Sequence, residues 1–391
     1  MSKTILTINS GSSSIKSSLY RFNDDETLLA RGELDRIGFD EGTFQMLDWN
    51  GNWLVNETCN LQNHGKAFEK LFSWLESSGF EIDGIGHRVV HGGPNYRSHQ
   101  KIDQDLIDVL HKITSMNPLH LPSEIQGIEF TSQVYPKLPQ VACFDTAFHA
   151  TLPLEAKLYP IPRKFADDGI FRYGFHGLSY EYILQELKNI PEKLIIAHLG
   201  NGASMAAVKD GKSVDTTMGF TPSAGLMMGT RCGDIDPGIL IYLAAHKGYS
   251  ADDLREMVNT ESGLQGISEL SSDVKELLDL EHNNQKAKEA LDLFCYRARK
   301  YIGALAAALG GCDTLVFTAG IGERSAEIRQ RICSELGYLG IEIDDQANQK
   351  NSSTISTKNS GVKVLVIRTN EELMIARHTN NILFAEQISK V

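Results

Sequence analysis

The sequence lacks any apolar run long enough to cross a membrane. No stretch approaches the roughly 18 consecutive apolar residues that a spanning helix requires. Residues 1–3 lead directly into a predicted strand instead of the charged and apolar regions of a signal peptide. These absences predict a cytoplasmic protein without a membrane partner.

Cysteine is sparse and shows no metal-binding spacing. Six cysteines are scattered over 391 residues without a C-x-x-C pair, which predicts reduced thiols. His87 and His91 are four residues apart, but the valines between them and the glycines after them indicate a strand. In a strand this spacing does not form the helical ligand pair of a zinc site, so we expect no structural metal there.

Positive charge is also in deficit. The chain has 38 Lys and Arg against 50 Asp and Glu, a net charge of −12. This balance argues against nucleic acid as a partner, and an anionic ligand would have to be held by local cations. The sequence has no G-x-x-x-x-G-K-[S/T], no G-x-G-x-x-G before a helix and no H-E-x-x-H. It therefore does not indicate a P-loop NTPase, a Rossmann dehydrogenase or a zinc protease of the H-E-x-x-H type.

What the sequence does contain is a glycine turn after an apolar run at three places. These are ILTINSGSSS at residues 5–14, LIIAHLGNG at 194–202 and LVFTAGIGE at 315–323. Glycine permits positive φ and close backbone approach, so free N–H groups and small hydroxyls can surround an anion. One such turn is common, but three in one chain predict a phosphate-binding protein.

The length predicts two domains, because one core rarely serves 391 residues. Residues 3–60 are typical of antiparallel hairpins, and helices are expected over 66–77, 103–116 and 284–309. Ser123 to Gln126 matches a capping box, and a buried strand over 140–144 ends on Asp145. The pattern restarts near residue 150, which suggests two related α/β halves. We expect domains at 1–149, completed by a helix at about 373–391, and at 150–372.

Arg231 differs from the other polar residues beside glycines. It lies in an apolar, glycine-rich loop, where burial without an anionic partner would cost several kcal/mol. Its planar donor fork suits a carboxylate or a phosphate. Asn9, Arg88, Asp145 and similar residues at element ends are each more often simple caps or surface groups.

Nine motifs, in order along nearly the whole chain, closely resemble those of the acetate kinase family. They are NSGSSS at 9–14, GHRVVHGG at 86–93, FDTAFH at 144–149, RYGFHG at 172–177, HLGNG at 198–202, MGTR at 228–231, GDIDP at 233–237, TAGIGE at 318–323 and TNEEL at 369–373. The family belongs to the sugar-kinase/Hsp70/actin superfamily. The resemblance thus implies an α/β fold of two duplicated actin/ribonuclease-H-like domains with a nucleotide-binding cleft between them.

The resemblance also implies roles for individual residues. Asn9 and Glu371 would hold Mg²⁺ or Mn²⁺. The implied catalytic residues are Asp145, His176, Arg231 and His120. The implied acetate site comprises Arg88 for the carboxylate and Val90, Leu119, Phe175 and Pro222 for the methyl group. The residues implied to bind ATP or ADP are Lys16, His198, Leu199, Gly200, Asn201, Gly202, Asp273, Val274, Lys275, Gly320, Ile321, Gly322, Glu323 and Arg324.

The chemistry fits these residue types. A carboxylate is already ionised at pH 7 and needs no general base, so the difficulty lies in bringing two anions together. Arginine, histidine and Mg²⁺ can neutralise the transferring phosphoryl group. We therefore predict an acetate kinase that forms acetyl phosphate and ADP from acetate and ATP. The resemblance also implies a homodimer that forms through the second domain, to which the helix expected over 284–309 could contribute.

Three alternatives remain at this point. A propionate or other short-chain carboxylate kinase would share the motifs, because one methylene in a pocket is worth only about 1–3 kcal/mol. Lys275 replaces the arginine usual in the family, which leaves the choice of nucleoside triphosphate open. A nucleotide-switched binding protein of the Hsp70 or actin type would bind ATP but would have no use for Arg231.

Overall fold

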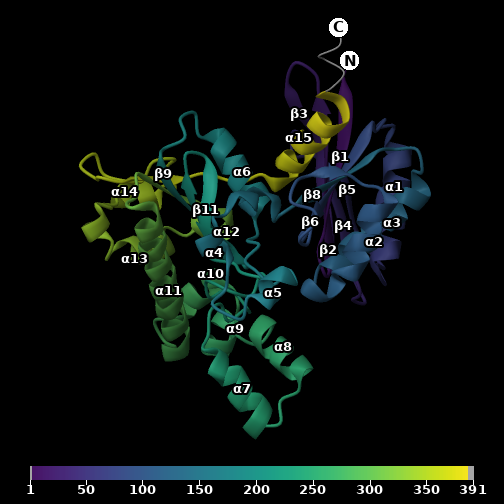
Figure 1. Ribbon diagram of the computed structural model, residues 1–391. Helices are drawn as coiled ribbons and strands as arrows, with labels where there is room; N and C mark the ends of the chain where they lie inside the picture. Colours follow the sequence, from purple (N-terminus) through teal and green to yellow (C-terminus); the bar gives the residue numbers. More distant parts are fainter. Residues whose placement is uncertain (1, 386–391) are drawn as a thin grey trace. The chain divides into compact units, whose positions relative to one another are not determined.

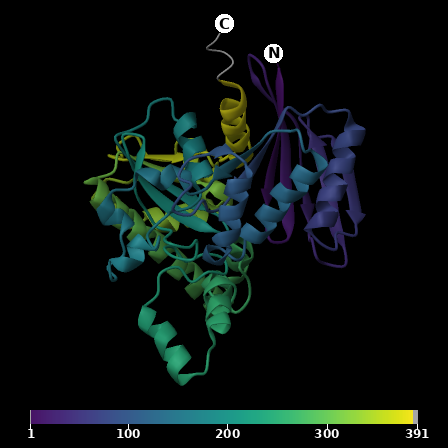
Figure 2. The same ribbon diagram turned by 45° about the vertical axis from the view of Figure 1, so that its right-hand side comes forward.

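The computed structural model describes residues 2–385, which form two compact units. Unit 1 comprises Met1–Ala147 and Asn370–Val391, and unit 2 comprises Phe148–Thr369. Figures 1 and 2 show both units in colours that follow the sequence. The last part of the helix expected at about 373–391, residues 386–391, lies outside the described residues.

Unit 1 is built on an eight-stranded sheet with the order β5-β4-β3-β2-β1-β6-β8-β7. Its strands are β1 (Lys3–Ser10), β2 (Ser14–Phe22), β3 (Glu26–Asp35), β4 (Gly42–Asp48), β5 (Trp53–Cys59), β6 (Gly84–Val89), β7 (Gln100–Lys101) and β8 (Gln140–Phe144). Strands β1 to β5 form the expected antiparallel hairpins, and β6 and β8 continue the sheet parallel to β1.

The helices of unit 1 cover this sheet with apolar faces. They are α1 (His64–Ser78), α2 (Gln104–Lys112), α3 (Leu121–Val134) and α15 (Glu371–Phe384). Helix α1 buries Phe68, Leu71 and Leu75 in the core. Helix α15 approaches β6 so closely that a Cβ at Gly86 would lie 2.2 Å from the Thr379 hydroxyl. Gly86 is thus required by the contact that holds the C-terminal helix in unit 1.

Unit 2 repeats the central part of the first sheet. Its strands are β9 (Lys193–Leu199), β10 (Ala203–Lys209), β11 (Lys212–Thr216), β12 (Thr314–Thr318) and β13 (Lys363–Val366), in the order β11-β10-β9-β12-β13. This order corresponds to β3-β2-β1-β6-β8 of unit 1, with three antiparallel strands followed by two parallel ones in both sheets. The first two glycine turns, after β1 and after β9, are therefore equivalent.

The rest of unit 2 is mostly helical. Its helices are α4 (Leu154–Lys157), α5 (Lys164–Asp167), α6 (Gly177–Glu186), α7 (Pro237–His246), α8 (Ala251–Asn259), α9 (Gly263–Ser268), α10 (Val274–Leu280), α11 (Gln285–Leu309), α12 (Ala319–Arg324), α13 (Ala326–Cys333) and α14 (Asp345–Gln349). The apolar stripe of α11 is buried within the unit, and the helix ends at Gly310 with a φ of 68°. In both views α7 and α8 form a lobe that extends away from the sheet of unit 2 (Figures 1 and 2).

Two local expectations are wrong. Helix α3 begins at Leu121, and the Ser123 hydroxyl donates to the His120 carbonyl instead of capping a helix start. The reason is Pro122, whose fixed φ suits the first helical turn and moves the start upstream. At the first two glycine turns, the amides of Gly11 and Gly200 donate to carbonyls across the turn. Those two N–H groups are therefore not available to an anion.

Candidate active site

In unit 1 the predicted site residues gather around Arg88. The Nε and Nη2 atoms of Arg88 donate to the two carboxylate oxygens of Asp145 at 3.2 and 2.5 Å, and Nη1 donates to Asn9 Oδ1 at 3.3 Å. The sheet explains this meeting, because β6 pairs with β8 and β1 pairs with β6. Since the carboxyl ends of parallel strands meet at one edge, residues 57 and 79 positions apart become neighbours.

The electrostatics of this cluster follow from one cation among several acids. Burial opposes the charge of Arg88, but Asp145, Glu371 and Glu124 outweigh this effect and raise its pKa. Burial also raises the pKa of Glu371 to about 7, with Arg88 acting in the opposite direction. Asp145 is fully buried and its bidentate pair with Arg88 is the strongest ionic contact in the group. A further cation would be stabilised beside these carboxylates.

Glu124 belongs to the same cluster but was missed in the sequence. It is only 2% exposed on α3, and its Oε2 accepts the Val90 N–H at 2.9 Å. Its Oε1 is buried and has no hydrogen-bond partner among the described residues. Burial raises the pKa of Glu124 to about 8, with Arg88 acting in the opposite direction. The role of Glu124 could not be recognised in the sequence, because Glu124 lies inside the segment that was interpreted as a capping box.

Glu124→Gln is expected to make the protein less sensitive to alkaline pH. Between pH 4.5 and 8 the unfolded chain releases the Glu124 proton while the folded chain retains it, so stability falls as pH rises. From pH 6 to pH 8 this contribution amounts to about 2 kcal/mol. Urea unfolding at both pH values should show a correspondingly smaller loss in the variant. Glu129→Gln, which changes an exposed residue of α3, should behave like the unchanged protein, and parallel curves for all three would contradict the assignment.

The remaining predicted residues of unit 1 differ in exposure. Val90 is buried, whereas Leu119 is 41% exposed. His120 immediately precedes α3, and its carbonyl accepts the Ser123 hydroxyl. Lys16 is exposed on β2 opposite Asn9 and lowers the pKa of Glu371 electrostatically. Val90 is the buried residue of this group, and its backbone N–H is held by Glu124.

In unit 2 the side chains of His176 and Arg231 meet at the second glycine turn. A Cβ placed on Gly202 would lie 3.5 Å from His176 Nε2 and 3.7 Å from Arg231 Nη1. Arg231 is half-buried, less than its apolar loop suggested, and it donates to the Pro222 carbonyl at 3.3 Å. Gly202 thus leaves room where a side chain would contact both donors. An anion at this turn would meet a guanidinium and an imidazole.

Phe175 and Pro222, the other two predicted pocket residues, also belong to unit 2. Both are buried, and Phe175 directly precedes His176. The Phe175 carbonyl lies 3.1 Å from Nε2 of the buried His149, whose Nδ1 bonds Ser213. The backbone directly before His176 is therefore fixed by a hydrogen bond to His149.

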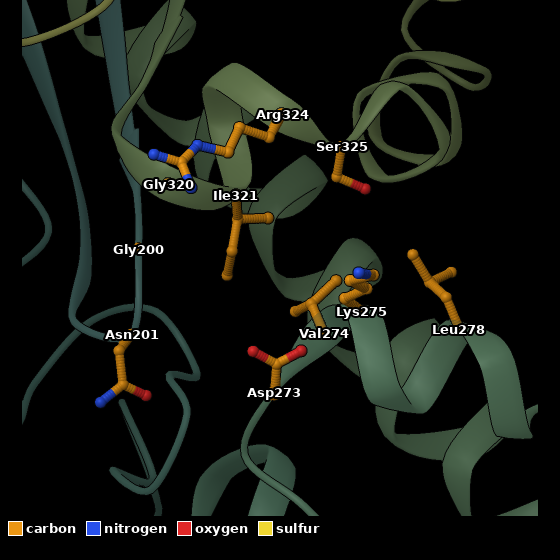
Figure 3. A pocket seen from close by; sticks show the side chains of 10 residues that line it. All are labelled: Gly200, Asn201, Asp273, Val274, Lys275, Leu278, Gly320, Ile321, Arg324 and Ser325. Atoms are coloured by element: carbon orange, nitrogen blue, oxygen red, sulfur yellow. The ribbon is translucent and has the colours of Figure 1, made fainter. Parts of the chain in front are cut away.

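A cavity of about 540 Å³ lies entirely within unit 2. It is lined by Gly200, Asn201, Asp273, Val274, Lys275, Leu278, Gly320, Ile321, Arg324 and Ser325. Figure 3 shows Gly200 and Asn201 across the cavity from Leu278, with Ile321 pointing between them and Arg324 reaching toward Gly320. Eight of these ten residues were predicted for the nucleotide, and Leu278 and Ser325 were not. The cavity combines the apolar side chains of Val274, Leu278 and Ile321 with polar and cationic groups, which suits a nucleotide.

Five residues of unit 2 predicted for the nucleotide do not line this cavity. They are His198, Leu199, Gly202, Gly322 and Glu323. The third glycine segment is not the expected turn, because residues 319–324 form the short helix α12 directly after β12. Glu323 instead accepts the N–H groups of Ala319 and Thr369, so it links the start of α12 to the chain after β13. The Gly322 carbonyl accepts a hydrogen bond from the fully buried Arg329. These hydrogen bonds hold α12 in place without contributing side chains to the cavity.

A duplicated α/β fold with a cavity at two glycine segments and adjacent cations is typical of a nucleotide-binding protein. Comparison with known proteins identifies the family. The sequence model of the acetokinase family matches residues 4–377. The acetate kinase of Clostridium novyi is 45% identical to this chain, over 97% of this chain and 98% of its own length. The chain therefore belongs to the acetokinase family.

Solved structures agree with this assignment. A propionate kinase from Francisella tularensis matches with a TM-score of 0.92 and 38% identity, over 97% of this chain and all of that one. The acetate kinase of Porphyromonas gingivalis matches with a TM-score of 0.87 and 37% identity, again over 97% of this chain and 100% of that one. The expected fold of two duplicated actin-like α/β domains is thus confirmed, and the protein is a kinase.

Proposed function

We propose that this protein is an acetate kinase, which transfers the γ-phosphoryl group of ATP to acetate and forms acetyl phosphate and ADP. The observation that carries the proposal is the approach of His176 Nε2 and Arg231 Nη1 to Gly202 in the unit that also contains the nucleotide-sized cavity. Two donors at one glycine turn can neutralise the charge that a phosphoryl group spreads over its oxygens during transfer.

Arg88 is proposed to bind the carboxylate of acetate. Three of its N–H groups are engaged by Asp145 and Asn9, which leaves two of the five guanidinium donors for a ligand. The pair with Asp145 fixes the orientation of the guanidinium, so the carboxylate would meet a preorganised donor. Because acetate is already an anion at pH 7, Asp145 would not act as a base but would hold Arg88 and balance charge.

Asn9 and Glu371 are proposed to hold Mg²⁺, with Asp145 nearby. Carboxylate and amide oxygens are the ligands that Mg²⁺ prefers, and the cluster around Arg88 has more acids than cations. When bound, the ion would neutralise phosphate charge and orient the terminal phosphoryl group. Lys16 and the residues of the cavity are proposed to bind the nucleotide itself.

Trapping the product with hydroxylamine tests the function directly. Hydroxamate should form only with ATP, Mg²⁺ and a short carboxylic acid, and acetate should be preferred when formate, acetate, propionate and butyrate are compared. ATP hydrolysis that is independent of the acid would instead support a nucleotide-switched binding protein. Repeating the assay with GTP tests whether Lys275, which lines the cavity, changes the nucleotide preference.

Val90→Ala is expected to shift the preference toward propionate. The smaller side chain would make room for one more methylene, which is worth about 1–3 kcal/mol, so the propionate/acetate ratio of kcat/KM should rise about tenfold. Val89→Ala removes the same volume from the neighbouring buried position in β6 and should leave the ratio unchanged. An unchanged ratio in the Val90 variant would place the acid pocket elsewhere.

We further propose a cytoplasmic homodimer that forms through the α7–α8 lobe. Helix α7 has the sequence PGILIYLAAH, and none of its ten residues, all of them described, is buried. Ile241 is 69% exposed, and Tyr242 lies beside it. An apolar helix that covers no core within its own chain favours contact with a second copy. No described helix is both long and apolar enough to cross a membrane.

Ile241→Asp is expected to convert the dimer into a monomer. A charge in the centre of an apolar contact would remain desolvated and unpaired, which weakens association by several kcal/mol. Light scattering coupled to gel filtration should give twice the chain mass for the unchanged protein and the mass of one chain for the variant. Ile161→Asp alters an exposed isoleucine outside the lobe and should remain dimeric.

A further inference from the structure

A chain of hydrogen bonds behind His176 is not explained by the site residues described so far. His176 Nδ1 lies 2.9 Å from the Ser204 hydroxyl on β10, and that hydroxyl is also bonded to the hydroxyl of Tyr180 on α6. Ser204 and Tyr180 are both fully buried. Buried hydroxyls that are joined in this way polarise one another and fix the orientation of the groups that they contact.

The donor and the acceptor in each of these hydrogen bonds are assigned from the chemistry of the three side chains. A phenol is a stronger donor than an aliphatic hydroxyl, so Tyr180 is expected to donate to Ser204. The Ser204 hydroxyl then has one hydrogen to donate, and its other partner is Nδ1 of His176. An Nδ1 that accepts a hydrogen bond places the proton of a neutral imidazole on Nε2. Nε2 is the atom that lies toward Gly202, beside Arg231.

The neighbouring ring disfavours positive charge on both histidines at once. His176 and His198 are stacked with their centroids 4.1 Å apart and their planes at 21°. Two imidazolium ions at this separation would repel each other. The second ring shows the same arrangement, because His198 Nδ1 lies 2.8 Å from the Ser179 hydroxyl. His176 itself has a φ of 60°, so its backbone is held in a conformation that non-glycine residues adopt at a cost.

We infer that Ser204 and Tyr180 are positioning residues that hold His176 as the Nε2–H tautomer, ready to donate to the phosphoryl group in transfer. The phosphoryl group as the acceptor of this hydrogen bond rests on the proposed function. The tautomer does not, since it follows from the hydrogen bonds of Ser204 with Tyr180 as the donor. Without Ser204 the imidazole could rotate or place its proton on Nδ1, and Nε2 would no longer be a donor.

The tautomer can be measured on the full protein without substrates by NMR of ¹⁵N-labelled histidine. The His176 signals are assigned by their loss in His176→Gln. We expect an Nε2–H pattern in the unchanged protein and a mixture of tautomers in Ser204→Ala. In hydroxamate assays, Ser204→Ala should lower kcat by about tenfold, the value of one hydrogen bond near the upper end of its range, with little change in either KM. Tyr180→Phe retains the Ser204 donor and should lower kcat less.

A matched control separates this role from a general effect on folding. Tyr173→Phe removes another fully buried phenol hydroxyl of unit 2, which donates to the Gly169 carbonyl at 2.9 Å. It should lower stability about as much as Tyr180→Phe but leave the His176 signals and kcat unchanged. Ser204→Cys retains the size and a weak donor, so its kcat should lie between those of serine and alanine.

Two results would overturn the inference. One is an Nδ1–H pattern for His176 in the unchanged protein, and the other is a Ser204→Ala variant that retains both the tautomer and full turnover. A protein that shows the expected tautomers but forms no hydroxamate would contradict the proposed function and leave the hydrogen-bond chain established.

Discussion

Arg231→Ala is expected to reduce kcat by about 10³-fold or more and to change the KM for ATP only several-fold. The guanidinium lies with His176 at Gly202 and is absent from the residues that line the nucleotide cavity. Its contribution should therefore appear mainly when charge spreads over the transferring phosphoryl group, where one arginine can supply 10³–10⁵ in rate. Steady-state kinetics with varied ATP and acetate separate the two parameters.

Arg231→Lys refines this test. Lysine retains the charge but loses the planar fork, so it should recover only part of the lost turnover. Arg163→Ala changes an exposed arginine of the same unit and should leave the kinetics unchanged. If Arg231→Ala instead raised the KM for ATP strongly at constant kcat, Arg231 would be a nucleotide ligand and not a catalytic residue.

Arg88→Met is expected to destabilise unit 1 by about 3–5 kcal/mol and to abolish acetate phosphorylation. Removing this cation leaves the buried carboxylate of Asp145 without its partner, and a buried pair that loses one member carries the full penalty of the other. Asp145→Asn should be milder, because Glu371 would still balance part of the charge of Arg88. Urea unfolding at pH 7 gives the difference in free energy.

Lys66→Met provides the control for Arg88→Met. Lys66 pairs with Glu69 on the surface of α1, where both side chains are more than half exposed. Exposed pairs contribute about 0–1 kcal/mol, so this change should be nearly silent. If Arg88→Met were equally silent, the acid cluster would be compensated by groups other than Arg88.

The elements and the glycine turns were largely predictable because they depend on local patterns. The stripe of α11 and its stop at Gly310, the hairpins of residues 3–60 and the strand that ends on Asp145 all follow from apolar periodicity and glycine conformation. The motifs were sufficient to indicate the family. The start of α3 was not predicted correctly, because Pro122 and Ser123 each signal a helix start a few residues apart. The helix begins at the position that suits the proline.

The contacts that could give the site its chemistry are decided by the tertiary structure. Arg88 meets Asp145 because β6 and β8 are neighbours, Glu124 on α3 accepts from the Val90 amide directly after β6, and Ser204 on β10 meets His176. No local pattern encodes these distances, because each joins residues 28 to 57 positions apart. The sequence by itself determined which residue types are present and on which elements they lie. Folding decided which of them share a proton, a charge or a hydrogen bond.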